Sequence, residues 1–349
     1  MERLTRISHY KELAALLAQR MDSGKWPVGK PIPSCRELVR EFATSLKTVQ
    51  LALNVLKAEG RLRTSQGKPS YVALGAPLSR ILENTVALVL PHSIQDATSN
   101  PDYQGVIERV GQTHWTLLTL HTAIWRREFP VGLRELPVRG ILLMGPCSSE
   151  MLHRYESLGR PVVVLDQPAQ DCQVHAVAVD NFKAAFEATT RLLKLGHRRL
   201  AFVRTLVSSL KALNPNALER EKGFVAACQK HLGESAQYKI FSAWESAAVA
   251  MDILHARPRF TAVLTTSCTH AAQLEQAAHQ AGMNVPRDLS VVTFQDTAPQ
   301  MRDWSGPQID FKRIGSRAVE LLERNKPGLQ QIRVPAIWHA GDSLGLPIQ

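Results

Sequence analysis

The chain has 349 residues, and its 42 lysines and arginines outnumber its 31 aspartates and glutamates, for a formal net charge of +11. This length has room for two or three domains with buried cores, and 44% hydrophobic with 21% charged content is typical of globular proteins. No run of 18 apolar residues occurs, which excludes a membrane-spanning helix.

The first 72 residues predict three short helices followed by a hairpin. The first helix has an apolar stripe from Tyr10 to Met21 and stops near Gly24. The second begins at Ser34 with a capping box, in which the Ser34 hydroxyl and the Glu37 carboxylate each accept a bond from the other residue's amide. Pro33 prevents the preceding residues from continuing that helix backwards.

The third helix begins at Ser45 and has one apolar and one polar face. Val49 and Leu53 represent the apolar face, whereas Lys47 and Gln50 lie on the polar one. Residues 61–65 and 70–72 then predict two strands joined by a basic tip, which suits a phosphate or minor-groove contact. Three helices and a hairpin make a winged helix-turn-helix, whose last helix enters the major groove of DNA.

The positive charge is concentrated in this region. Residues 1–74 have a net charge of +7, and the remaining 275 residues have a net charge of +4. The alternative is a helical subdomain whose basic face is only solvated. Since a fifth of the chain has most of the excess charge, we favour a surface that binds phosphates.

The motifs across residues 8–72 resemble the DNA-binding domain of the GntR family of transcription regulators. They are Pro33-Ser34-x-Arg36-Glu37-Leu38, Ser45-x-x-Thr48-Val49 and a glycine in the wing. The resemblance implies a DNA-binding set of Ser34, Arg36, Ser45, Leu46, Lys47, Thr48, Gln50 and Lys68, in which the two serines are helix caps. Leu46 and Gln50 stand where the family usually has arginine, so we expect altered base preference, and Gln50 is suited to an adenine edge.

Residues 75–84 predict a linker, because Gly75 and Pro77 interrupt any helix. Short β-branched runs then alternate with helical stretches, at residues 85–91, 115–121, 140–145, 161–166, 176–179, 199–204, 238–242, 262–266 and 289–294. Such continuous apolar strands are typical of parallel sheets covered on both faces. The predicted fold class is therefore α/β, with two doubly wound lobes after the winged helix.

Five phrases in this second region resemble the effector domain of the LacI family, which has a periplasmic-binding-protein-like fold. They are Val179-Asp180-Asn181, residues 195–202, residues 220–224, residues 285–292 and residues 314–319. The second domain comprises residues 85–349, and the resemblance covers about 85–345 of it. It implies two lobes between which the chain crosses three times. We place these crossings near residues 194, 306 and 326. Lobe one would then hold 85–193 and 307–325, and lobe two 194–306 and 326–345.

In this fold a ligand lies between the lobes, at the carboxyl ends of strands. The resemblance nominates Asp180, Arg220, Trp244, Ser267 and Gln295. Each of three residues has an alternative to a role in ligand binding. Asp180 could instead cap the next helix, Arg220 could be an exposed arginine on a helix, and Trp244 could be a buried packing residue. Ser267 and Gln295 stand where the family has other polar groups, and an amide offers a sugar fewer acceptors than a carboxylate. We therefore expect either another polar metabolite or the loss of ligand binding.

Taken together, these features predict a sequence-specific transcription regulator, a repressor, that acts as a homodimer on a pseudo-palindromic operator. A small polar effector, such as a sugar derivative, would modulate it, and no cofactor or metal is expected. The first six residues lack the apolar core of a signal peptide and the five scattered cysteines form no Cys-x-x-Cys pair, so we expect a cytoplasmic protein. The alternatives are a second domain that only dimerises, a solute-binding protein, which would need a signal peptide, and an enzyme, for which no catalytic motif appears.

Overall fold

The computed structural model describes residues 10–64, 69–73, 82–90, 100–121, 129–130, 132–169, 172–207, 212–233, 237–243, 247–295, 302–324 and 328–348. The chain divides into two compact units, one made mainly of Met1–Thr85 and one that holds nearly all the rest. Most of the predicted linker, 75–84, lies outside the described residues.

The first unit is a winged helix-turn-helix. Its helices are α1 (Tyr10–Asp22), α2 (Cys35–Glu41) and α3 (Leu46–Ala58), and β1 (Leu62–Thr64) pairs antiparallel with β2 (Ser70–Val72). The predicted stripes form one core, in which Leu13, Leu38 and Leu56 are fully buried. Arg20 pairs with Glu41 and stacks on Phe42, so this cation stabilises the fold.

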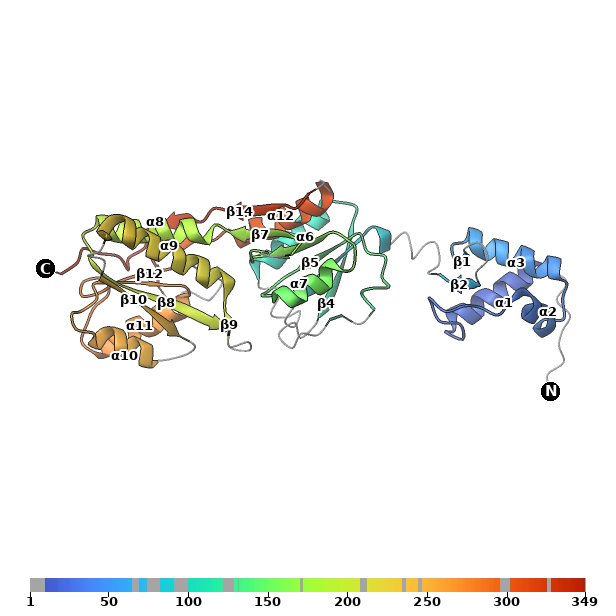
Figure 1. Cartoon of the computed structure of the whole chain (residues 1–349), viewed down its shortest axis with the longest axis horizontal. Coiled ribbons are helices and arrows are strands. Elements are labelled where there is room, and N and C mark those ends of the chain that lie inside the picture. Colours follow the sequence, from blue (N-terminus) through green and yellow to red (C-terminus); the bar gives the residue numbers. More distant parts are fainter. Residues whose placement is uncertain are drawn as a thin grey trace. The chain divides into compact units, whose positions relative to one another are not determined.

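The second unit contains two mainly parallel sheets (Figure 1). All nine strands predicted for it are present. The sheet of lobe one has the order β14-β7-β6-β5-β3-β4, from the strands β3 (Thr85–Leu90), β4 (Thr116–His121), β5 (Gly140–Leu143), β6 (Val162–Leu165), β7 (His175–Val179) and β14 (Gln331–Val334). The sheet of lobe two has the order β10-β8-β11-β12, from β8 (Arg199–Val207), β10 (Gln237–Ala243), β11 (Ala262–Thr265) and β12 (Ser290–Thr293), and the short β9 (Ala212–Leu213) pairs with β8.

Helices cover these sheets, as continuous apolar strands require. Lobe one has α6 (Pro101–Gly111), α7 (Ser149–Glu156) and α12 (Phe311–Arg324), and lobe two has α8 (Asn181–Lys194), α9 (Pro215–Leu232), α10 (Ala247–His255) and α11 (Cys268–Gln280). α8 packs along α9, and α6 packs along α12. The buried strand residues of both lobes belong to large apolar cores.

Two of the three predicted crossings are wrong, and so are the lobe boundaries drawn from them. The prediction placed the first crossing near 194, but α8 packs on α9 of lobe two, so the chain crosses between β7 and α8, near Asp180. It placed the third near 326, but β14 pairs in parallel with β7 of lobe one, so the chain crosses after Val334. The second crossing was placed near 306, and the chain crosses there at β13 (Gly306–Gln308). β13 pairs with β15 (Ile337–His339), which belongs to the third crossing.

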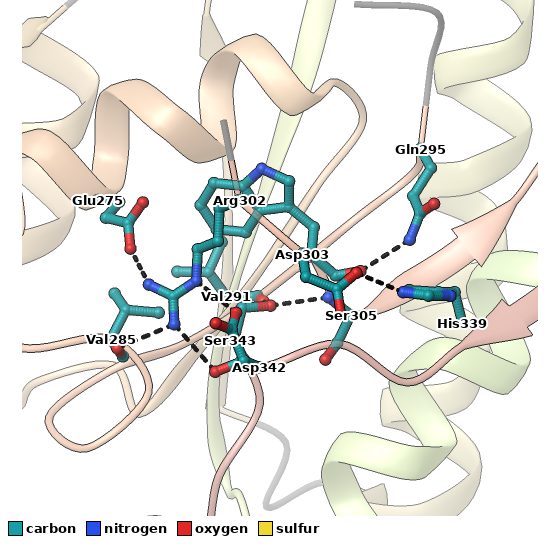
Figure 2. Close-up of polar contacts among 11 residues, drawn as sticks. Glu275, Val285, Val291, Gln295, Arg302, Asp303, Ser305, His339, Asp342 and Ser343 are labelled. Atoms are coloured by element: carbon teal, nitrogen blue, oxygen red, sulfur yellow. Dashed lines mark hydrogen bonds and ion pairs between the residues drawn. The ribbon is translucent and has the colours of Figure 1, made fainter. Parts of the chain in front are cut away.

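Side chains fasten the second and third crossings to lobe two (Figure 2). The Ser343 hydroxyl donates to the Val291 carbonyl at 2.6 Å and accepts from the Ser305 amide at 2.9 Å. Arg302 pairs with Glu275 and Asp342, as Figure 2 shows. The buried Ser343 bonds and the half-buried pair of Arg302 with Glu275 hold the second and third crossings on lobe two.

The contact between α6 and α12 depends on two glycines. A Cβ added at Gly105 would lie 2.0 Å from the Lys312 carbonyl oxygen, and one at Gly315 would lie 2.1 Å from the Asp102 carbonyl oxygen. Only glycine permits this approach, which holds the start of α6 against the backbone of α12.

We therefore expect Gly105→Ala to destabilise the second unit by about 1–3 kcal/mol, because the methyl group must push α12 away. Thermal unfolding followed by circular dichroism measures the effect. Gly111→Ala is the matched control in the same helix, since its Cβ would have nothing within 4 Å, and it should leave stability unchanged or raise it. Equal melting temperatures for the two variants would contradict this account of the contact.

Candidate functional site

The first unit presents a polar face built on α2 and α3. The predicted capping box is present, with the Ser34 amide 2.7 Å from the Glu37 carboxylate and the Glu37 amide 3.4 Å from the Ser34 hydroxyl. Ser45 caps α3 in the same way, through the Thr48 amide at 3.1 Å. These caps fix the first turns of both helices, where a helix-turn-helix contacts DNA.

Exposed polar side chains project from the first two turns of these helices. Arg36, Lys47 and Gln50 are exposed, and in the described part of the chain Arg36 and Lys47 form no ion pair. Leu46, in the first turn of α3, is 48% exposed and lies beside Lys47. The cations that the fold itself uses are others, such as Arg61, which pairs with Asp22 at 2.8 Å.

A groove of about 710 Å³ lies between the start of α2, the exposed face of α3 and the hairpin. Gln50, Asn54 and Lys57 line it from successive turns of α3, and Ser34 and Thr64 line it from the other two sides. The set implied by the family resemblance does not include Asn54 and Lys57, although their spacing from Gln50 predicts one helical stripe. Lys68, in the predicted wing tip, lies outside the described residues.

In the second unit, buried polar groups meet where the two lobes join. We call Asp102, Asp166, Asn181, Asn216, Arg220 and Thr266 the interlobe cluster. Its centre is Arg220 of α9, which is 8% exposed. Its Nε donates to Asn181 Oδ1 at 2.7 Å, one Nη donates to the Thr266 carbonyl at 2.9 Å, and its guanidinium lies 4.0 Å from the centre of the Phe294 ring.

Asp166 brings lobe one into this cluster. It follows β6 with a φ of +50°, a conformation that aspartate tolerates better than most residues. The neighbouring Gln167 side chain bonds both backbone groups of Cys147 at 2.7 Å, which ties the ends of β5 and β6 together. From lobe two, Asn216 donates to the Asp166 carbonyl at 2.7 Å. Burial raises the pKa of Asp166 to about 6, although Arg220 and Asn216 oppose that rise.

Asp102, in the first turn of α6, is the second buried carboxyl group. It is 5% exposed, and one oxygen of its carboxyl group has no hydrogen-bond partner, as is also true of one oxygen of Asp166. Burial, together with the charge on Asp166, raises the pKa of Asp102 well above its usual value. An acidic pair with unused acceptors is the feature of this cluster that the sequence analysis missed.

The structure gives most of the predicted effector residues other partners. Asp180 caps α8 by accepting from the Lys183 amide, as its alternative interpretation held. Ser267 caps α11, and the Gln295 amide donates to the Trp304 carbonyl at 2.7 Å (Figure 2). Arg220 is in the cluster rather than exposed. Trp244 lies outside the described residues.

Two family models match the chain. Residues 9–72 match the gntR family of bacterial regulatory proteins, and residues 189–343 match the periplasmic binding protein-like domain. The arabinose metabolism transcriptional repressor of Geobacillus stearothermophilus is 26% identical over 97% of this chain and 95% of its own length. Catabolite control protein A of Staphylococcus xylosus is 26% identical over 81% of this chain and 90% of its own.

Solved structures agree on the fold of the second domain. A LacI family transcriptional regulator from Enterococcus faecium with bound ribose covers 76% of this chain and all of its own, with a TM-score of 0.62 at 18% identity. The regulator CcpA of Lactococcus lactis covers 75% of this chain and 99% of its own, with a TM-score of 0.61 at 18% identity.

The chain is thus a DNA-binding transcription regulator. More specifically, it joins a winged helix-turn-helix that matches the gntR family model to a second domain with the periplasmic-binding-protein-like fold that solved LacI family regulators share. In the described part of the chain, no helix combines the length and apolar character needed to cross a membrane.

The raised pKa of Asp102 predicts how stability depends on pH. A carboxyl group whose pKa is higher in the folded state stabilises the fold while it is protonated, and this contribution is lost as the pH rises through the folded-state pKa. Asp102→Asn, which stays neutral, should therefore melt higher than wild type at pH 8 by a margin that shrinks at pH 5. The loss is about 1.4 kcal/mol for each unit by which the pKa is raised.

Thermal unfolding of the full chain at the two pH values measures that margin. Asp252→Asn is the control, because Asp252 is exposed on α10 and its removal should give the same margin at both pH values. An Asp102→Asn margin that does not change with pH would show that Asp102 is ionised in the fold without cost.

Proposed function

We propose that this protein is a repressor that binds a pseudo-palindromic operator as a homodimer and is controlled by a small polar metabolite bound at the interlobe cluster. The observation that carries the proposal is the combination of a capped, exposed polar face on α3 with a buried polar cluster where the lobes meet. The first is suited to DNA, and the second to a ligand that the lobes enclose.

The DNA-binding residues keep the roles proposed for them from the sequence. Arg36 and Lys47 are exposed cations at the start of α2 and α3, which suits contacts with phosphates. Gln50 lines the groove together with Asn54, and an amide can pair with both the N6 and N7 atoms of adenine. We add Asn54 and Lys57 to the candidates, since they continue the same stripe. Lys68 remains a candidate through the family motif alone.

The interlobe cluster supports ligand control. Asp166 of lobe one bonds Asn216 of lobe two, and Arg220 bonds Asn181 beside the first crossing. A ligand that exchanges the bond between Asp166 and Asn216 for its own would change the angle between the lobes, and hence the separation of two DNA readers in a dimer. The repressor named for arabinose metabolism and the regulator solved with ribose support a ligand of the sugar type.

The remaining parts of the proposal are a cytoplasmic location and the absence of an enzymatic activity. Full-length likeness to transcription regulators supports both. If the second domain only dimerises, ligands will leave operator affinity unchanged while sedimentation still gives dimers.

For DNA binding, we expect Arg36→Ala to weaken binding to operator and scrambled DNA alike, because a phosphate contact is independent of sequence. Gln50→Ala should cost about 1–3 kcal/mol on the operator and little on scrambled DNA. Operators are first selected from genomic fragments, and affinities then come from fluorescence anisotropy at fixed salt.

Lys11→Ala is the charge-matched control. Lys11 is exposed on α1 and lines a different hollow, between α1 and the end of α3, so its loss should leave operator affinity nearly unchanged. If Gln50→Ala weakens both DNAs equally, the base-reading role is wrong. If Lys11→Ala weakens binding as much as Arg36→Ala, the groove face is not the DNA-binding face.

A further inference from the structure

We propose that Leu46 recognises the C5-methyl group of a thymine in each half of the operator, so that an apolar contact sets the preference at that base pair. The inference rests on the proposed function, since it names what one residue of the DNA-binding face reads. It starts from the position of this leucine. Leu46 is 48% exposed in the first turn of α3, between the cap residue Ser45 and the exposed cation Lys47.

Leu46 lies on the side of α3 that faces the groove. Gln50, which lines the groove, follows it by four residues, and side chains four residues apart are neighbours on one face of a helix. A second exposed leucine on this helix, Leu51, is 40% exposed but lies about 140° further round the helix axis than Leu46. The apolar surface of Leu46 is therefore continuous with the polar stripe proposed to read bases.

The neighbouring side chains of the first turn are used in other ways. The Thr48 hydroxyl lies 2.8 Å from the Ser45 hydroxyl, and the Thr48 amide donates to the same Ser45 oxygen at 3.1 Å, so Thr48 belongs to the cap. Val49 is fully buried in the core. Lys47 is a cation suited to phosphates. Within residues 45–49, Leu46 is thus the exposed side chain that neither caps the helix nor has a charge for a phosphate.

The chemistry of DNA offers such a side chain one favourable target. A leucine forms no hydrogen bond, so contact with a phosphate or a polar base edge would only remove the hydration of that group. In the major groove, the apolar group that the base pairs present is the C5-methyl group of thymine. The cap at Ser45 fixes the first turn, and the exposed Arg36 and Lys47 attract the phosphate backbone towards it.

Uracil tests this contact, because it lacks the methyl group of thymine and keeps its hydrogen-bonding groups. Operators selected from genomic fragments are synthesised with single thymines replaced by uracil, one position at a time on both strands. Fluorescence anisotropy at fixed salt then gives their affinities for the full-length protein. We expect at least one replacement to weaken wild-type binding about fourfold, as the loss of one buried methyl group predicts, and replacement in both half-sites to weaken it about 15-fold.

Leu46→Ala should bind the thymine operator about fourfold or more weakly than wild type and should no longer respond to uracil at that position. Leu51→Ala is the matched control, an exposed leucine of the same helix, and it should keep the full response. Melting temperatures of both variants confirm that the affinities refer to folded protein. The inference is overturned if no methyl group affects wild-type binding, if Leu46→Ala keeps the fourfold response, or if Leu51→Ala loses it.

The same measurements separate this failure from failure of the proposed function. If Arg36→Ala and Gln50→Ala act as expected while no methyl group affects binding, the DNA-binding face stands and only the role of Leu46 is wrong. If the protein selects no operator, the proposed recognition of specific DNA fails, and this inference fails with it.

Discussion

The second domain depends on one buried cation. Arg220 is held by Asn181 at the first crossing, by the Thr266 carbonyl at the end of β11 and by the ring of Phe294 after β12, while the charge of Asp166 reaches it from lobe one. A buried guanidinium is tolerated only when its donors are satisfied and its charge is balanced. Arg220 therefore organises the carboxyl ends of the strands in lobe two, and the link to lobe one is the charge of Asp166 together with the bond from Asn216 to the Asp166 carbonyl.

The elements were largely predictable from the sequence, because continuous apolar strands and capped helices are local patterns. The capping box at Ser34 and all nine strands predicted for the second unit confirm this. The crossings were not predictable in the same way. The lobe to which α8 belongs is decided by its packing on α9. β14 is a short, half-exposed strand, and its pairing with β7 decides its place. Such long-range contacts leave no local pattern.

Arg220 was nominated from the sequence, but its partners were missed for a related reason. Asp180, Ser267 and Gln295 were chosen at the correct strand ends, but Asn181, Thr266 and Phe294, each one position away, make the contacts with Arg220. Successive residues at a strand end face different ways, so a choice at the correct edge can still fall on the residue that caps the next helix. Asp102 was missed because a helix of ordinary appearance gives no sign that its first turn is buried against another chain segment.

The central claim is that one molecule couples an operator and an interlobe ligand, and linkage tests it most directly. The factor by which a bound sugar changes operator affinity is measured by anisotropy, and the factor by which the operator changes the affinity for that sugar is measured by calorimetry. The account predicts one common factor, of about 5–150, because coupling free energies are reciprocal. A sugar that binds at the cluster while both factors equal one would contradict it.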